Sequence, residues 1–261
     1  MPLFHIVILA IIQGITEFLP ISSSGHLILL HKLLGSDGLG TDQIMDIAVH
    51  VGTLFAVFVY FHRDLLRMAK AGAGRKMMLI IVVASLPAIA AGYAVHVFAP
   101  TWRDSIVVMG WTFIIFGILM GAADRFRPRD KTLADMTWKR ALFIGLAQAL
   151  SLVPGTSRSG ITMTAARYLG FERVEAARFS LFLGIVAISG AGALGGLELL
   201  KADNAALSRD ALIAACVSFT AGLGAISFMM RWLSKSSFTP FVIYRIILGV
   251  ILLTLAYSGA A

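Results

Sequence analysis

The sequence predicts an all-α integral membrane protein that folds as a single membrane domain over residues 1–261. Hydrophobic residues make up 58% of the chain and charged residues only 14%, and the mean hydropathy is +0.86. Apolar windows recur at close to the ~20 residues that a helix needs to cross a hydrocarbon core of about 30 Å. Since no period-two alternation runs through them, they favour helices over barrel strands.

The apolar windows predict about six transmembrane helices. They cover residues 44–61, 77–99, 105–122, 178–200, 211–233 and 239–258. Basic side chains follow the first and third windows: Arg63, Arg67, Lys70, Arg75 and Lys76, then Arg125, Arg127, Arg129, Lys131, Lys139 and Arg140. The positive-inside rule places both connections in the cytoplasm and the acidic 34–43 connection outside. The net charge of +8 is then explained by topology and by attraction to anionic lipids, so no nucleic-acid partner is expected.

Two polar segments do not fit as simple spans. With this orientation, residues 1–35 start and return outside, whereas residues 138–176 start and return inside. Each is predicted to be a re-entrant helix-loop-helix hairpin, because Pro20 and Pro154 interrupt the helices. Irregular backbone at membrane depth is tolerated where it lines a cavity, so we expect both loops to reach the middle of the bilayer.

The two hairpins also resemble each other. Gln13 to Gly25 and Gln148 to Gly160 both span twelve positions, with a proline between them. Given their opposite sidedness, this pattern predicts inverted-topology repeats with a site at the repeat interface. Chance similarity between two stretches rich in serine, glycine and proline is the competing explanation.

The loops carry the residues expected to bind phosphate. Glu17 and Arg158 are charged side chains in apolar surroundings, which indicates function. Backbone N–H groups and hydroxyls at the start of a helix form a cradle for an anion, and the guanidinium of Arg158 matches phosphate oxygens in pairs. The hydroxyl residues expected to bind substrate are Ser22, Ser24, Thr156, Ser157 and Ser159. The alternative is that these serines only cap the broken helices.

Glu17 suggests a divalent cation, Mg²⁺ or Ca²⁺, between its carboxylate and the phosphate, to which Gln13 one turn earlier adds an oxygen ligand. The alternative is a Glu17–Arg158 ion pair that only holds the loops together. Ser23 is the candidate nucleophile, and His26 is the candidate for proton transfer. Whether Ser23 or a cation-bound water attacks the phosphate is left open.

Three strings carry a resemblance to a known family: residues 16–26 (TEFLPISSSGH), 154–160 (PGTSRSG) and 241–249 (FVIYRIILG). The chain resembles the undecaprenyl-pyrophosphate phosphatases associated with bacitracin resistance. The resemblance implies a multi-pass enzyme of the bacterial inner (plasma) membrane that hydrolyses undecaprenyl pyrophosphate to undecaprenyl phosphate and phosphate, recycling the lipid carrier of peptidoglycan synthesis. It also implies a divalent cation, an active site opening toward the periplasm, and catalytic roles for Glu17, Ser23, His26 and Arg158. Since the family's first motif begins with Glu or Gln, the presence of Gln13 argues against a mechanism that needs two carboxylates.

Inverted repeats with broken helices are also typical of transporters. A transporter or flippase for an anionic or phosphorylated-lipid substrate is therefore the alternative function. Gly117 with Gly121, and Gly192 with Gly196, allow close helix packing, either within the bundle or across a homodimer. Asp46 and His50 share a helical face and are expected to make a hydrogen bond between helices, with lining of the same cavity as the alternative. Arg245 is expected to face the bundle interior.

Overall fold

A computed structural model describes residues 2–34, 41–70, 72–98, 105–202 and 205–258. Within these ranges the fold is helical, and the only β-type pairing is an isolated bridge between Lys131 and Phe171. The α-helices are α1 (Leu3–Thr16), α2 (Ser23–Leu34), α3 (Thr41–Tyr60), α4 (His62–Ala69), α5 (Ala73–Phe98), α6 (Ile106–Phe126), α7 (Trp138–Ala149), α8 (Arg158–Tyr168), α9 (Arg173–Ala202), α10 (Ala205–Leu233) and α11 (Thr239–Tyr257). Two 3-10 turns, η2 (Leu133–Asp135) and η3 (Leu150–Leu152), flank α7.

Each of the six apolar windows lies, to within one residue at its ends, in a long helix of its own, namely α3, α5, α6, α9, α10 or α11. Residue 99 lies outside the described residues. Among the described residues, α5, α6, α10 and α11 contain stretches long and apolar enough to cross a membrane. Helices α3 and α4 would supply a fifth span, although they are bent by 73° at their junction. The predicted class, an all-α membrane protein, is therefore confirmed. Residues 35–40 of the predicted outer connection lie outside the described residues.

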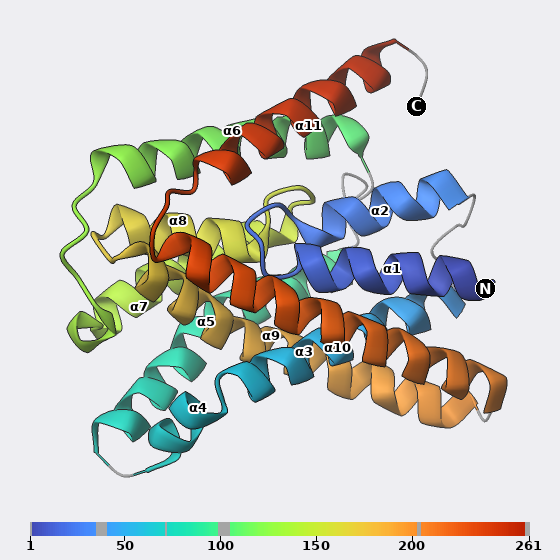
Figure 1. The fold of residues 1–261 in the computed structure, drawn as a ribbon, viewed down its shortest axis with the longest axis horizontal. Coiled ribbons are helices and arrows are strands. Elements are labelled where there is room, and N and C mark those ends of the chain that lie inside the picture. The colour runs from blue at the N-terminus through green and yellow to red at the C-terminus, as the bar shows by residue number, and fades with distance from the viewer. Residues whose placement is uncertain (1, 35–40, 71, 99–104, 203–204, 259–261) are drawn as a thin grey trace.

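The two polar segments form helix-break-helix units, α1–α2 and α7–α8. In Figure 1 they extend toward opposite ends of the molecule, and their breaks face each other near its middle. The breaks are in contact, because Ser159 Oγ donates a hydrogen bond of 3.1 Å to the carbonyl oxygen of Leu19. Residues that are far apart in the sequence therefore meet at the centre of the bundle.

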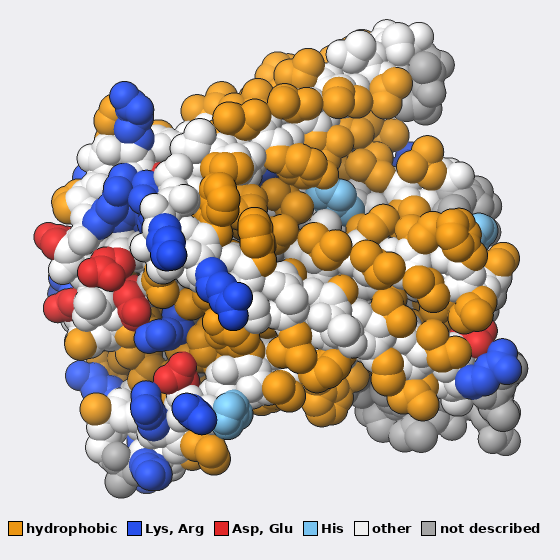
Figure 2. All heavy atoms as spheres, in the orientation of Figure 1, with side chains coloured by type: hydrophobic (Ala, Val, Ile, Leu, Met, Phe, Trp, Pro, Cys, Tyr) orange, Lys and Arg blue, Asp and Glu red, His pale blue; other side chains and the backbone are white. Residues whose placement is uncertain are grey.

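Charge is distributed unevenly along the molecule. Figure 2 shows most of the visible Lys and Arg side chains at one end, over α4 and the connection between α6 and α7. The N-terminus and the end of α11 lie toward the opposite end (Figure 1). Large hydrophobic side chains such as Trp111, Ile118 and Ile247 are about half exposed on the flanks, as expected for helices that face lipid.

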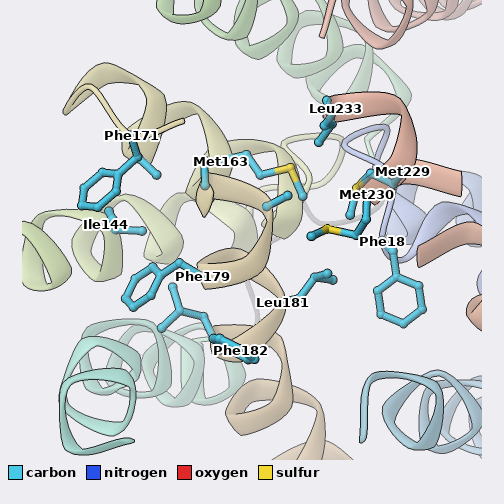
Figure 3. Close-up of a cluster of buried hydrophobic side chains, with 14 of the residues drawn as sticks. Phe18, Ile144, Met163, Phe171, Phe179, Leu181, Phe182, Met229, Met230 and Leu233 are labelled. Carbon is cyan, nitrogen blue, oxygen red and sulfur yellow. The ribbon is translucent and has the colours of Figure 1, made fainter. Parts of the chain in front are cut away.

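The largest buried cluster lies beside the breaks. Figure 3 shows Phe18 of the first break with Met163 of α8, Phe182 of α9 and Met229 of α10. Phe18 is fully buried, and its ring lies close to Gly222 of α10, where an added Cβ would be 3.0 Å from Cε2. Since helices in lipid associate through close van der Waals packing, this contact fixes the backbone next to Glu17.

Small residues bring α6 and α11 together. A Cβ at Gly117 would be 3.2 Å from Cβ of Arg245, and one at Gly121 would be 3.3 Å from Cγ1 of Val242. This pair of glycines therefore serves packing inside the bundle. The side-chain surroundings of Gly192 and Gly196 lie outside the described residues.

Candidate active site

Glu17 lies at the end of α1, where the helix gives way to the first break, and is 6% exposed. Its Oε1 accepts a hydrogen bond from Arg158 Nη2 at 2.5 Å, which is also an ion pair. Its Oε2 accepts hydrogen bonds from Ser23 Oγ at 2.6 Å and from Gln13 Nε2 at 3.0 Å. The acid and the guanidinium that stand out in the sequence are thus in contact, and each comes from a different break.

The two breaks have the same local geometry. Ser22 and Ser157 both have positive φ, 72° and 71°. The hydroxyl of Ser22 accepts from the N–H of Gly25 at 3.4 Å, and that of Ser157 accepts from the N–H of Gly160 at 3.1 Å. Left-handed backbone at a non-glycine residue is uncommon and concentrates at functional sites. These serines do cap the restarting helices, as the alternative interpretation of the sequence expected, and they also shape the loops.

Arg245 of α11 ties the breaks together. It is fully buried, as expected from the sequence. Its Nη1 donates to the carbonyl oxygen of Pro20 at 3.3 Å, and its Nη2 donates to those of Gly155 at 3.0 Å and Thr112 at 3.3 Å. One side chain therefore donates hydrogen bonds to backbone carbonyl groups of both breaks and of α6. Carbonyl groups in unwound backbone that is buried away from water need such donors.

The second break contains buried donors that no described residue accepts. Arg158 Nη1 is buried and has no hydrogen-bond partner among the described residues, and the same is true of Thr156 Oγ1. Space for the guanidinium is provided by Gly184 of α9, because a Cβ there would collide with Arg158. A guanidinium with one nitrogen on Glu17 and another without a protein acceptor is suited to bind an anion next to the carboxylate.

The remaining hydroxyls differ in exposure. Ser157 and Ser159 are buried and lie 3.2 Å apart at their Oγ atoms. In the first break, Ser22 is buried, Ser23 is half-buried and Ser24 is exposed. The side of the site formed by the first break is therefore the more accessible one.

His26 is half-buried in the first turns of α2. Its Nδ1 lies 2.7 Å from the carbonyl oxygen of Ser22, so Nδ1 carries the proton and donates. Its Nε2 lies 2.5 Å from the hydroxyl of Tyr244. The structure thus pairs His26 with Tyr244 and Ser23 with Glu17, and a proton transfer between His26 and Ser23 stays a prediction.

His50 of α3 lies beside Glu17, as the alternative interpretation of the face that it shares with Asp46 expected. Its Nε2 lies 3.8 Å from Oε2 of Glu17, and its Nδ1 is 2.6 Å from the carbonyl oxygen of Asp46. The expected hydrogen bond between helices is made by Asp46, whose carboxylate lies 3.0 Å from Nε2 of His31 on α2. The spacing of four residues between Asp46 and His50 predicted that they share a helical face. The residues that this face contacts, Glu17 and His31, are shown only by the structure.

A divalent cation such as Mg²⁺ or Ca²⁺ needs oxygen ligands. Among the described residues, no group of three or more His, Cys, Asp or Glu side chains could hold a metal. The available oxygens are the Glu17 carboxylate and the buried Oε1 of Gln13, which has no hydrogen-bond partner. Mg²⁺ is commonly held by one or two carboxylates together with substrate phosphate oxygens. These residues fit a cation that the substrate helps to bind.

Comparison with known proteins decides the family. The family model described as bacitracin resistance protein BacA matches residues 6–251. The undecaprenyl-diphosphatase of Jannaschia sp. is 47% identical over 271 residues, and that of Ruegeria pomeroyi is 46% identical over 270 residues. Each alignment covers 99% of this chain and all of the relative. The chain belongs to the BacA family.

The three strings that carry the resemblance lie within the matched BacA region and meet in space. The first contributes Glu17, Ser23 and His26, the second contributes Arg158, and the third contributes Tyr244 and Arg245. Tyr244 and Arg245 belong to the site's framework through contacts with residues more than two hundred positions away. In this BacA protein the site is therefore assembled from both ends and the middle of the chain.

Proposed function

We infer that this chain is an undecaprenyl-diphosphatase. It hydrolyses undecaprenyl diphosphate to undecaprenyl phosphate and inorganic phosphate, which returns the lipid carrier to cell-wall synthesis. Full-length relatives of that name support this function. The observation that carries it is the meeting of Glu17, Ser23 and Arg158, because it combines a base, a hydroxyl and a phosphate ligand in one place.

We propose that Ser23 Oγ attacks the terminal phosphorus. Glu17 takes the hydroxyl proton across the 2.6 Å hydrogen bond, and the bond from phosphorus to the bridging oxygen breaks, so undecaprenyl phosphate leaves. Arg158 and the hydroxyls of the second break hold the terminal phosphate as its charge shifts. A water molecule then hydrolyses the phosphoserine and releases inorganic phosphate.

Direct attack by water is the other route, with Ser23 only positioning the phosphate. Phosphate that carries oxygen from solvent in a single turnover of a fully active Ser23→Ala enzyme would establish it. Trapped phosphate on Ser23 after acid quench would support attack by the serine. His26 is the proposed donor of a proton to the leaving group, with Tyr244 orienting its ring.

Glu17 and Gln13 are the proposed ligands of the divalent cation, Mg²⁺ or Ca²⁺. Such an ion would neutralise the diphosphate next to a carboxylate that would otherwise repel it.

We propose six spans, α3, α5, α6, α9, α10 and α11, with α1–α2 and α7–α8 as re-entrant hairpins of inverted repeats. The matched φ angles and caps of Ser22 and Ser157 support the repeat. So does the packing, since α1 lies against α10 whereas α7 lies against α5. In this arrangement the equivalents of α1, α2, α3, α5 and α6 are α7, α8, α9, α10 and α11.

The proposed orientation puts the basic end in the cytoplasm of a bacterial cell and opens the site toward the periplasm. The accessible side formed by Ser23 and Ser24 supports this opening, because α1 and α2 extend away from the basic end (Figure 1). Single cysteines on a Cys216→Ser background test it. A membrane-impermeant maleimide added to spheroplasts should label Leu3→Cys and spare Lys131→Cys, and the reverse pattern would refute the orientation.

Phosphate release in detergent tests the function itself. The wild type should release phosphate from undecaprenyl diphosphate, whereas Glu17→Ala and Arg158→Ala should lose at least about a hundredfold. Arg209→Ala, at an exposed arginine, is the matched control and should keep full activity. A transporter or flippase would show no turnover without a membrane to cross, and normal release by Arg158→Ala would contradict the role given to that residue.

A further inference from the structure

A cavity with charged and apolar walls lies at the basic end of the molecule, away from the breaks. Its volume is about 530 Å³, and it is bounded by the end of α6, the start of α9 and the start of α11. Its polar lining consists of Asp124, Arg125, Arg129, Arg173, Ser237 and Thr239. Asp124 is twelve residues along α6 from Thr112, which contacts the second break. That is about 18 Å at 1.5 Å per residue.

The charge of this cavity is strongly positive. The carboxylate of Asp124 is the only acidic side chain in its lining. It accepts two hydrogen bonds of 2.7 Å from Arg173 and one of 3.3 Å from Arg167. Arg125 and Arg129 also line the cavity. Together with Arg167, which contacts Asp124, four arginines and one carboxylate leave three positive charges.

Two of these arginines have N–H donors that no described residue accepts. Arg125 makes no hydrogen bond or ion pair with any residue that the structure describes, and Arg129 uses only Nη2, on the carbonyl oxygen of Asp124 at 3.1 Å. Both are exposed, whereas Arg167 is fully buried. Arg125 and Arg129 are therefore available to a ligand, and Arg167 and Arg173 keep Asp124 in place.

Hydroxyl groups complete the polar wall. Thr239 begins α11, and the hydroxyls of Ser237 and Thr239 lie 2.8 Å apart. The first backbone N–H groups of this helix are already used, because Phe238 N donates to Asp124 Oδ2 at 3.2 Å and Thr239 N donates to Ser237 Oγ at 3.3 Å, and Pro240 has no N–H. The arginine forks and the hydroxyls together match the oxygens of a phosphate group.

The other wall is apolar and continues onto the lipid-facing surface. Ile118, Ala122 and Val242 line the cavity, and the side chain of Ile118 is 54% exposed. A ligand with a phosphate at one end and a hydrocarbon chain at the other would match this lining. Basic pockets between transmembrane helices at the cytoplasmic side bind anionic headgroups.

We propose that this cavity, lined by Arg125 and Arg129, binds an anionic phospholipid of the leaflet at the basic end. The phosphate lies between the two arginines and the start of α11, and one acyl chain follows Ile118 and Val242. The bound lipid stabilises the contacts of α6 with α9 and α11. This site does not depend on the hydrolytic function.

Binding of lipid to the full chain in neutral detergent tests the proposal. Dioleoyl phosphatidylglycerol should raise the thermal unfolding midpoint and remain bound in native mass spectrometry, and dioleoyl phosphatidylcholine should do neither. Arg125→Ala/Arg129→Ala should bind phosphatidylglycerol about thirtyfold more weakly, since each basic side chain near an anionic lipid contributes a factor of about five. Arg125→Gln alone should lose about fivefold without disturbing any internal contact.

The matched control is Arg63→Ala/Lys70→Ala, which removes the same charge from α4 and its C-cap at the same end. It should bind phosphatidylglycerol like the wild type. Equal loss in the two double variants would overturn the proposal in favour of a diffuse basic surface. Competition by inorganic phosphate at equal concentration would overturn it in favour of a soluble anion, and unchanged binding in the cavity variants would also refute it.

Discussion

At the scale of single residues, Glu17 is where the two halves of the chain meet. One carboxylate oxygen is held by Arg158 from the second break and the other by Ser23 and Gln13 from the first hairpin. His50 approaches it from α3. Because the carboxylate is buried, its position and charge depend on all of these neighbours. Small changes around it are therefore expected to alter catalysis strongly.

Gly184 offers a test that leaves every polar group in place. A methyl group at this position would collide with the guanidinium of Arg158, so Gly184→Ala should displace it and reduce phosphate release by about a hundredfold. Gly190→Ala lies on the same helix with nothing within 4 Å of its Cβ. That control should keep full activity and gain slightly in stability. Equal activities of the two variants would show that activity does not depend on the observed position of the Arg158 guanidinium.

Gln13 offers a test of the cation. EDTA should abolish phosphate release by the wild type, and Mg²⁺ should restore it. Gln13→Glu adds a second carboxylate one turn from Glu17, so the concentration of free Mg²⁺ at half-maximal activity should fall by about tenfold, since affinity rises with ligand charge. Titrating activity against free Mg²⁺ measures this, with Gln13→Ala expected to shift in the opposite direction. Full activity of the wild type in EDTA would exclude the cation.

At the scale of elements, the two breaks are organised by the serines at positive φ. Each residue holds a left-handed turn and accepts the N–H three residues later. The strain of such a turn is offset by the cap and by the carbonyl contacts of Arg245. The breaks are therefore fixed shapes and keep the donors of both loops pointed at one place.

Two substitutions of Ser157 separate the effect of the helix cap from the effect of backbone strain. Ser157→Ala loses the cap and keeps the strained φ, so its free energy of unfolding should fall by about 1–2 kcal/mol. Ser157→Gly also loses the cap but relieves the strain, and its loss should be only a few tenths of a kcal/mol. Chemical denaturation in a fixed detergent measures both. A glycine variant less stable than the alanine variant would show that backbone strain is not the dominant effect.

The sequence predicted the helices and the breaks better than the contacts that they make with distant segments. Window length and apolarity identified α3, α5, α6, α9, α10 and α11, and the prolines identified both breaks, because these signals are local. The pairing of Glu17 with Arg158 followed from their charge in apolar surroundings. The places of His50, Gly184 and Tyr244 depend on neighbours from distant segments. No local pattern of a single sequence records such contacts.

At the scale of the whole molecule, Arg245 joins parts that would otherwise separate. It is fully buried in α11 and donates to carbonyl groups of α6 and of both breaks. A lysine at this position would carry a compact ammonium group, which lacks the planar fork of a guanidinium and could not reach as many acceptors. The stability of the centre therefore rests on a guanidinium at this position.

Arg245→Met tests this role. It should lower the free energy of unfolding by at least about 3 kcal/mol, because several buried carbonyl groups lose their donor. Arg245→Lys should be intermediate, since it keeps the charge but reaches fewer acceptors. Thermal unfolding in detergent compares them with Arg231→Met, an exposed arginine at the end of α10. An Arg245→Met protein that unfolds at the temperature of the wild type would contradict the assignment.

The contact between Glu17 and Arg158 spans 141 residues of chain, and this separation has a consequence for biosynthesis. The first hairpin leaves the ribosome long before its counter-ion has been synthesised. A carboxylate without a cationic neighbour is costly to insert into hydrocarbon. In the proposed re-entrant arrangement, the nascent α1–α2 unit is therefore expected to stay hydrated, or its acid protonated, until α7–α8 arrives. We expect stable insertion of α1–α2 to be a late event, coupled to translation of the second half of the protein.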